Sequence, residues 1–197
     1  FRTLSGSTSA LNAYLASYNL FNQLKTAMPA YEDIGALFIY SEPNHTARDM
    51  FTSDFTYAEK TEIRSVIQEA VETDAYSHSM GWRHIEIGSA SYLFRFYGGR
   101  GTYLIAMAPL ERLSDTSKLR IESEAIALFA DLENNPLTAK DFVEQSGIDL
   151  DGDYSRYFLS GHGQRYMLVG RRIAGTDCRM VLAISESGYL DSLNTLQ

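Results

Sequence analysis

The chain has 197 residues, of which 17 are Lys or Arg and 25 are Asp or Glu, so its formal net charge is −8 at pH 7. Its content of 45% hydrophobic and 21% charged residues is close to that of globular proteins, which excludes a disordered chain and a collagen-like repeat. The acidic balance argues against binding to nucleic acid or to an anionic membrane surface, because both require clustered Lys and Arg.

The first thirty residues predict one long helix. Apolar residues recur there at spacings of three and four, which is the pattern of a helix with a single apolar stripe. The stripe consists of Leu11, Tyr14, Leu15, Tyr18, Phe21, Leu24 and Met28. We expect Ser7, Thr8 or Ser9 to cap the start of the helix and Pro29 to end it. A helix of this length is suited to a spine against which other elements pack.

A strand and a second helix follow the spine. Residues 34–40 are an apolar run, and the turn residues 41–44 end it, so we expect a strand there. After a polar stretch, Thr56 and Glu59 have the spacing of a capping box, which predicts the start of a helix over 56–71.

A meander of three strands is predicted next, at 82–87, 92–97 and 102–108. The last two strands are joined by Gly98-Gly-Arg-Gly101, a short loop rich in residues that accept positive φ. A helix, a strand, another helix and then an antiparallel meander are together typical of an α+β fold.

The second half of the chain repeats this order after a polar, partly helical connector at 110–122. The repeat consists of a strand at 125–130, a helix at 138–145, three strands at 154–159, 165–173 and 178–184, and a short helix from Glu186. We expect Thr138 to cap the helix and Gly147 to stop it.

No motif in the sequence indicates catalysis, metal binding or cofactor binding. The sequence Asp149-Leu-Asp151-Gly-Asp153 begins like a calcium loop, but Tyr154 and Ser160 stand where that loop needs Gly and Glu, which favours a solvated acidic turn. His45, His78, His84 and His162 lack metal-ligand spacing. The 98–101 loop lacks the Gly-Lys-Ser/Thr ending of a phosphate loop, and Ser160-Gly-His162 has no identifiable partner acid.

Cys178 is the single cysteine and cannot form an internal disulfide. It lies in an apolar strand, so we expect a small buried core residue rather than a catalytic thiol. The chain starts at Phe1 rather than Met, from which we expect a segment of a longer protein. No apolar run of about 18 residues is present to span a membrane.

The middle meander holds the candidate binding residues. If the hairpin loop has two or four residues, Phe94, Phe96, Tyr103 and Ile105 share one face of the sheet, and Leu93, Arg95, Tyr97, Leu104 and Ala106 share the other. A charge at Arg95 between two phenylalanines is costly unless it is paired or exposed. Arg95 therefore either has a structural partner or an exposed position, or else its guanidinium is directed at a ligand. Four nearby aromatic residues could line such a pocket or belong to the core: Tyr97, Tyr103, Trp82 and Tyr40.

Several short phrases carry a resemblance to a known family. They are Phe38-Ile-Tyr40-Ser41, Tyr92-Leu-Phe-Arg95, Gly101-Thr-Tyr103-Leu-Ile-Ala106, Leu128-Phe-Ala-Asp131 followed by Leu137-Thr138, and Arg165-Tyr-Met-Leu-Val169. With the order of elements, they make the chain similar to the extracytoplasmic double-Cache sensor domains of bacterial histidine kinases. The similarity is closest to Gram-positive two-component sensors linked to carbohydrate uptake, and it covers nearly the whole chain.

The resemblance implies an α+β fold in four parts. Residues 1–30 would form the spine helix, 31–113 a membrane-distal PAS-like subdomain, 114–185 a membrane-proximal PAS-like subdomain, and 186–197 a helix leading to a membrane segment. Ligands would bind in the distal subdomain. The aromatic–arginine signature of amino-acid-binding members is not recognisable here, which leaves the ligand open.

The function implied is that of an extracellular sensory input domain, without catalytic activity or cofactor, in a membrane-anchored bacterial protein. We expect the parent chain to be a two-component sensor histidine kinase. The alternatives are a chemoreceptor, a diguanylate cyclase or a membrane-tethered transcription regulator with the same module, and a soluble secreted binding domain. The expected partners are a small-molecule ligand or a ligand-loaded binding protein, and a second copy of the chain bound through the Leu11–Tyr18 face of the N-terminal helix.

Overall fold

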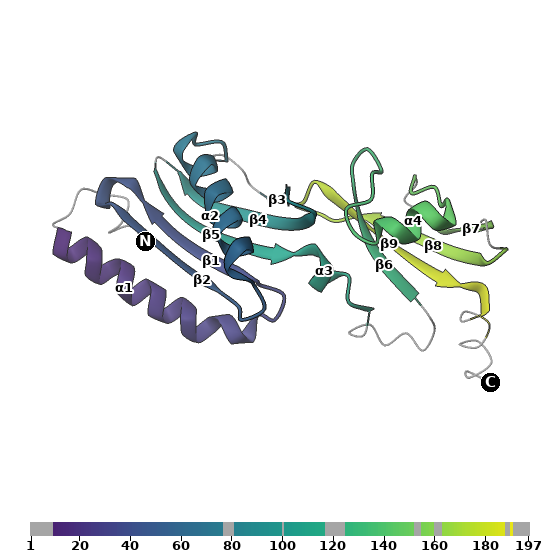
Figure 1. Cartoon of the computed structure of the whole chain (residues 1–197), viewed down its shortest axis with the longest axis horizontal. Coiled ribbons are helices and arrows are strands. Elements are labelled where there is room, and N and C mark those ends of the chain that lie inside the picture. Colours follow the sequence, from purple (N-terminus) through teal and green to yellow (C-terminus); the bar gives the residue numbers. More distant parts are fainter. Residues whose placement is uncertain are drawn as a thin grey trace. The chain divides into compact units, whose positions relative to one another are not determined.

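The computed structural model describes residues 10–76, 81–99, 101–116, 125–151, 155–159, 163–187 and 190. The chain divides into two compact units, at residues 1–109 and 110–197. Each unit is built on one antiparallel sheet (Figure 1). No helix in the described part of the chain is both long enough and apolar enough to cross a lipid bilayer.

The sheet of the first unit has five strands in the order β2-β1-β5-β4-β3. The strands are β1 (Ala36–Ser41), β2 (Thr46–Phe51), β3 (Trp82–Ile87), β4 (Ala90–Gly99) and β5 (Thr102–Pro109). The predicted strands at 34–40, 82–87, 92–97 and 102–108 are therefore present, and β2 was not predicted. β2 forms a hairpin with β1 through a 3-10 turn, η2 (Glu42–Asn44), and through His45, whose φ is 48°.

The β4–β5 hairpin has a two-residue loop, since Gly99 pairs with Thr102. Gly101 in this loop has a φ of 73°, which an L side chain rarely adopts. With an even loop length, Phe94 and Phe96 lie on the same face as Tyr103 and Ile105, because side chains alternate along a strand. The predicted division of the two faces is confirmed.

The helix α1 (Ala10–Ala27) is followed by a 3-10 helix, η1 (Met28–Ala30). The predicted capping residues 7–9 lie outside the described residues. Met28 is buried, but the first half of the apolar stripe is largely exposed, with Leu11 66%, Tyr14 54% and Tyr18 46% accessible. The stripe is therefore only partly covered by the protein's own sheet.

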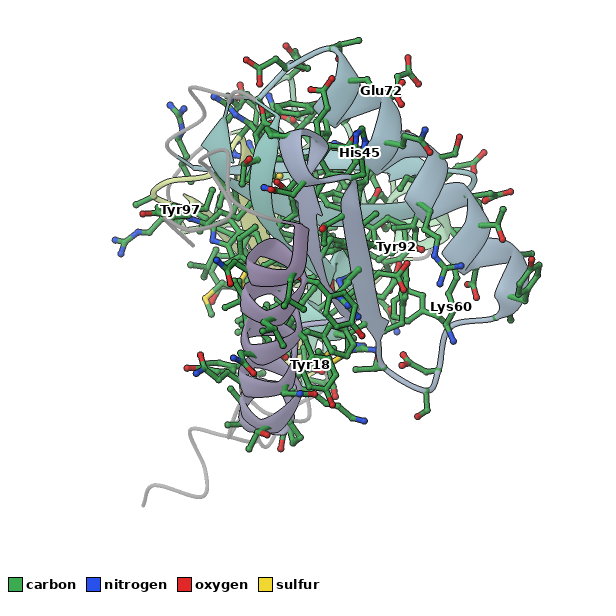
Figure 2. All side chains as sticks on the ribbon, turned by 90° about the vertical axis from the view of Figure 1, so that its left-hand side faces the viewer. Tyr18, His45, Lys60, Glu72, Tyr92 and Tyr97 are labelled. Carbon is green, nitrogen blue, oxygen red and sulfur yellow. The ribbon has the colours of Figure 1, made fainter. Side chains whose placement is uncertain are left out.

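The helix α2 (Tyr57–Glu72) begins with the predicted capping box. The Thr56 hydroxyl accepts a hydrogen bond from the Glu59 N–H at 3.3 Å, and the Glu59 carboxylate accepts one from the Thr56 N–H at 2.7 Å. α2 covers one face of the sheet, where its buried residues pack on the aromatic and aliphatic residues of the strands. Figure 2 shows α1 and α2 on opposite faces of this sheet.

The second unit contains a four-stranded sheet in the order β6-β9-β8-β7. Its elements are α3 (Leu110–Leu113), β6 (Ala125–Asp131), α4 (Lys140–Ser146), β7 (Ser155–Leu159), β8 (Arg165–Arg172) and β9 (Cys178–Ser185). The predicted strands are present. Of the predicted C-terminal helix, only Glu186, Ser187 and Leu190 are described, and all three are helical.

The start of α4 corrects one prediction, because Thr138 is not the capping residue. Ala139 precedes the helix with a φ of 50° and makes no side-chain cap. The Thr138 hydroxyl is buried and instead accepts a hydrogen bond from the Phe129 N–H of β6 at 2.9 Å. The Thr138 hydroxyl therefore satisfies a buried N–H of β6 and does not cap α4, because a buried backbone donor needs an acceptor. Gly147 ends the helix, as predicted, with a φ of 63°.

Candidate functional site

A cavity of about 170 Å³ lies in the first unit between α2 and the hairpin of β1 and β2. Its walls are formed by Phe38, Ile39, Tyr40, Ala47, Arg48, Asp49, Arg64, Ile67 and Gln68. A concave, mainly apolar site with a few polar groups is the usual form of a small-molecule binding pocket. The cavity is therefore the candidate ligand site.

The local structure explains why these residues meet. Phe38 and Tyr40 are two positions apart on β1, so both side chains point to the face that α2 covers. On α2, Arg64, Ile67 and Gln68 are three and four positions apart, which places them on one side of the helix. The period-two alternation of the strand and the three-to-four spacing of the helix thus place these side chains around the same cavity.

Two of the charged residues that line the cavity, Arg64 and Asp49, form an ion pair. The Arg64 Nε donates a short hydrogen bond to Asp49 Oδ2, and Nη2 donates to Oδ1 at 3.1 Å. This hydrogen bond raises the pKa of Arg64, so the guanidinium stays charged. The two side chains are 43% and 28% accessible. The pair is thus partly solvated, and it offers a ligand both a cation and an anion.

Two further polar groups line the same space. Burial raises the pKa of the Tyr40 hydroxyl, and the charges of Glu42 and Glu72 raise it further. Tyr40 is therefore a neutral hydrogen-bond donor at physiological pH. The Gln68 amide is held in place by Glu72, to whose carboxylate it donates at 2.8 Å.

This set of groups suits binding rather than catalysis. The lining residues supply hydrogen-bond donors and acceptors, one ion pair and apolar walls, but no Ser or Cys nucleophile beside a base. Within the described ranges, no three His, Cys, Asp or Glu residues are placed to hold a metal ion.

Of the five residues predicted from sequence, Tyr40 lines the cavity. Tyr103 pairs with Tyr40 across β1 and β5 and lies on the same face of the sheet. Its ring is fully buried, and its hydroxyl donates a short hydrogen bond to Asp74. Burial and this hydrogen bond both raise the pKa of Tyr103. Beside it, Tyr76 stacks on Phe96 with ring centroids 4.5 Å apart, so this end of the face is filled by aromatic rings.

The other three residues lie on the opposite face. Trp82 and Arg95 pair directly across β3 and β4, and Tyr97 follows Arg95 by two positions. Arg95 is exposed and Tyr97 is 64% accessible, so the guanidinium does not carry the cost of burial. Figure 2 shows Tyr97 on the far side of the sheet from α2, the helix on which Lys60 is labelled. The five residues therefore form two separate groups, and ligand contact by Arg95, Tyr97 or Trp82 remains a prediction.

Sequence reasoning missed Asp49, Arg64 and Gln68. The missed signal was the turn at 41–44, because a turn directly after a strand often joins it to a second strand. Recognising β2 would have placed Asp49 on the same face as Phe38, which is its register partner.

The remaining motifs agree with their structural interpretations where they are described. The Asp149 carboxylate accepts a hydrogen bond from the Asp151 N–H at 2.9 Å, as in an acidic turn. Cys178 is fully buried, and burial raises its pKa to about 12, so its thiol is not a nucleophile at neutral pH. His78 and residues 160–162 lie outside the described residues.

Comparisons with known proteins locate the fold. No protein-family model and no curated protein matches the chain. Among solved structures, the extracellular domain of a candidate histidine kinase, mmHK1S-Z3, aligns with a TM-score of 0.50 at 12% identity, over 100% of this chain and 89% of that one. The extracellular domain of a second candidate kinase, soHK1S-Z6, gives 0.47 at 12% identity, over 89% and 79%. The ligand-binding domain of the Pseudomonas aeruginosa amino-acid chemoreceptor PctC, in complex with GABA, gives 0.46 at 11% identity, over 83% and 79%.

The identities of these matches are low, so the comparison concerns the fold. The match to the mmHK1S-Z3 domain extends over the whole chain, and the present structure has an N-terminal helix and two antiparallel sheets, of five and four strands. The chain therefore has the α+β fold of the double-Cache extracellular sensor domains.

Proposed function

We propose that this chain is the extracytoplasmic ligand-binding sensor domain of a membrane-anchored bacterial signalling protein. The observation that carries the proposal is the cavity between α2 and the β1–β2 hairpin, in a chain whose fold matches an extracellular sensor domain over its full length. A small polar molecule would bind against the Arg64–Asp49 pair and the Tyr40 hydroxyl. The segment itself would sense and not catalyse.

The parent protein in this proposal is a two-component sensor histidine kinase. The support is the fold match to the extracellular domain of a candidate histidine kinase. Sequencing the reading frame on both sides of the segment tests this directly. Apolar stretches of about 20 residues on both sides would identify an extracytoplasmic loop. A downstream kinase domain would identify the output, whereas a chemoreceptor signalling domain would replace the kinase assignment.

The ligand site is tested by thermal-shift screening of the full 197-residue chain against free amino acids, GABA and small sugars. A ligand at 100 times its Kd stabilises the folded state by about 2.7 kcal/mol. In a chain of this size that corresponds to a rise in Tm of roughly 5–10 °C. The variant Ala47→Trp, which fills the cavity from β2, should abolish the shift.

Two control variants separate the two faces of the sheet. Arg95→Ala and Tyr97→Ala alter the opposite face, where the sequence predicted a ligand contact. If the ligand binds in the cavity, both variants should leave the ligand-induced shift unchanged. If Arg95→Ala abolishes the shift in a folded protein and Ala47→Trp does not, the ligand binds on the opposite face and the cavity is not the site.

The proposal includes a homodimer formed through α1. Its support is the exposed apolar surface on the first half of that helix, formed by Leu11, Tyr14, Leu15 and Tyr18. Sedimentation equilibrium of the wild type and of Leu15→Lys tests it. A wild-type dimer that the substitution converts to a monomer is expected, and a wild-type monomer at all concentrations would remove the dimer from the proposal.

A further inference from the structure

Strand β2 connects the candidate ligand cavity with α1. It is an edge strand, hydrogen-bonded to β1 on one side only. An edge strand is held by fewer backbone hydrogen bonds than an interior strand and is displaced at lower cost. Its consecutive residues Arg48 and Asp49 point to opposite faces of the sheet, because side chains alternate along a strand.

On the cavity face, Asp49 ties β2 to α2. Its carboxylate accepts two hydrogen bonds from the Arg64 guanidinium. That guanidinium also lies 5.3 Å from the centre of the Phe51 ring, so Arg64 contacts β2 at two positions. A ligand that hydrogen-bonds to either partner of this ion pair would compete with the contact between α2 and β2.

On the other face, Arg48 ties β2 to α1. Its Nε donates a hydrogen bond to the Ser17 hydroxyl at 3.3 Å. Its guanidinium carbon lies 5.1 Å from the centre of the Tyr14 ring and 6.0 Å from that of Tyr18, and the two rings are stacked. Figure 2 shows Tyr18 beside the β2 side of α1. One guanidinium thus contacts three residues over more than one turn of the helix.

Several described side chains on this part of α1 are exposed. Leu11 and Leu15 are exposed, whereas Ser17 is fully buried and its hydroxyl also donates to the Tyr14 carbonyl at 2.8 Å. A planar, permanently charged guanidinium can donate a hydrogen bond and lie against aromatic rings at the same time, which an ammonium group does less well. Arg48 therefore links the first half of α1 to the edge strand of the sheet.

We infer that Arg48 couples the ligand cavity to α1 through the single peptide step that separates it from Asp49. A ligand that rearranges the Asp49–Arg64 pair shifts the edge strand, and Arg48 transmits the shift to α1. The ligand drives this change only through its different affinity for the two arrangements. The inference rests on the proposed function for its biological meaning, but the mechanical coupling is testable without a ligand.

The test is a double-mutant cycle followed by hydrogen–deuterium exchange and mass spectrometry on the full chain. Asp49→Asn removes the charge at the cavity with little change in size. We expect it to speed exchange of the amides in residues 14–21 of α1 at least threefold. We expect Arg48→Gln alone to speed exchange of the same amides. Adding Asp49→Asn to Arg48→Gln should then raise their exchange rate by less than a further factor of 1.5. Non-additivity of this kind is the signature of two residues that act on one element.

Three further variants complete the design. Arg48→Lys keeps the charge and should lose the coupling as Arg48→Gln does. Arg171→Gln, which removes an exposed charge from the second unit, should leave exchange in α1 unchanged. Arg64→Gln replaces Asp49→Asn as the perturbation if the latter does not fold. Independent effects that multiply in the double variant, or normal α1 exchange in Asp49→Asn, would overturn the inference.

The cycle also separates this inference from the proposed function. If Ala47→Trp leaves ligand binding intact, the cavity is not the ligand site, yet the exchange coupling between Asp49 and α1 still stands. If the coupling is absent while Ala47→Trp abolishes binding, the site is correct and the route through Arg48 is wrong.

Discussion

The two units of the chain share an order of four strands but differ in the added edge strand and in the length of the helix beside the sheet. The second sheet, β6-β9-β8-β7, repeats the order β1-β5-β4-β3 of the first without an equivalent of β2. The helix that covers the first sheet has 16 residues, and α4 in the second unit has 7. The cavity of the first unit is lined by β2 and α2. The candidate site thus depends on the features by which the first unit exceeds the second.

In the second unit, aromatic side chains pack between α4 and the sheet. The Phe142 ring of α4 lies against Tyr166 with centroids 5.4 Å apart and nearly perpendicular planes, and Tyr166 stacks on Phe158 at 5.5 Å. Aromatic pairs of this kind stabilise a core beyond their buried area. The described core of the second unit thus includes three aromatic rings between α4 and the sheet, whereas the cavity of the first unit lies where α2 faces the β1–β2 hairpin.

The largest expected effects come from truncating each core separately. Phe94 and Leu128 are both fully buried, one in each unit. Phe94→Ala should cost about 3–5 kcal/mol and Leu128→Ala about 2–5 kcal/mol of unfolding free energy, since each leaves a cavity. Denaturant titration measures the loss, and hydrogen exchange shows where it acts. Phe94→Ala should speed exchange in β3–β5 and Leu128→Ala in β6, β8 and β9. Uniform acceleration in both units by either variant would show a single cooperative core.

The next effect compares the two threonines that the sequence pattern assigned to helix caps. Thr138→Ala leaves the buried Phe129 N–H without its acceptor and should cost about 1–3 kcal/mol. Thr56→Ala removes a true capping box at an exposed position and should cost about 0.5–2 kcal/mol. Thr→Ser at each site keeps the hydroxyl and should recover most of the loss. A larger loss at Thr56 would mean that the cap matters more than the buried hydrogen bond.

A smaller stability effect is expected at the cavity itself. Asp49 and Arg64 form a partly exposed ion pair, so Asp49→Asn should change the unfolding free energy by only about 0.2–1 kcal/mol. Its effect on ligand binding should be much greater, because the pair lies in the cavity wall. Isothermal titration with the ligand found by screening measures the change in affinity, and a thermal melt of the same variant measures the change in stability. A large loss of stability with unchanged affinity would assign the pair a structural role.

The smallest effect on stability at neutral pH is expected from ionisation of the Cys178 thiol. Burial raises its pKa from an ordinary 9.0 to about 12, so the folded thiol resists ionisation. Below pH 9 the thiol is protonated in both the folded and the unfolded state, and stability does not depend on it. Between pH 9 and 12 the unfolded chain ionises first, so stability falls as pH rises. Cys178→Ala should reduce the loss of unfolding free energy between pH 7.5 and 10.5.

Thiol labelling provides an independent check of the same burial. A disulfide reagent should modify Cys178 at pH 8 only as fast as the protein opens, and rapidly in denaturant. Immediate modification of the native chain would contradict the burial, and with it the alkaline prediction.

The parts of the fold that the sequence determines by itself arise from interactions between near neighbours. The capping box at Thr56 involves residues three apart, and the apolar strand runs need only period-two alternation. The Gly-rich segment 98–101 predicted the hairpin, but its loop length, which sets the faces of β4 and β5, was decided by the pairing of Gly99 with Thr102. Tyr40 ends one of these predicted strands, and it lines the cavity.

Tertiary structure alone decided the rest. β2 contains Arg48 and Asp49, which do not indicate a strand until α1 and α2 supply a partner on each face. Thr138 lost its capping role to a buried donor in another strand. The cavity is lined by Tyr40 and Arg64, which are far apart in the sequence. The burial of the α1 side chains depends on which of them contact the sheet. Such features depend on contacts between segments distant in sequence, whose energies no local pattern contains.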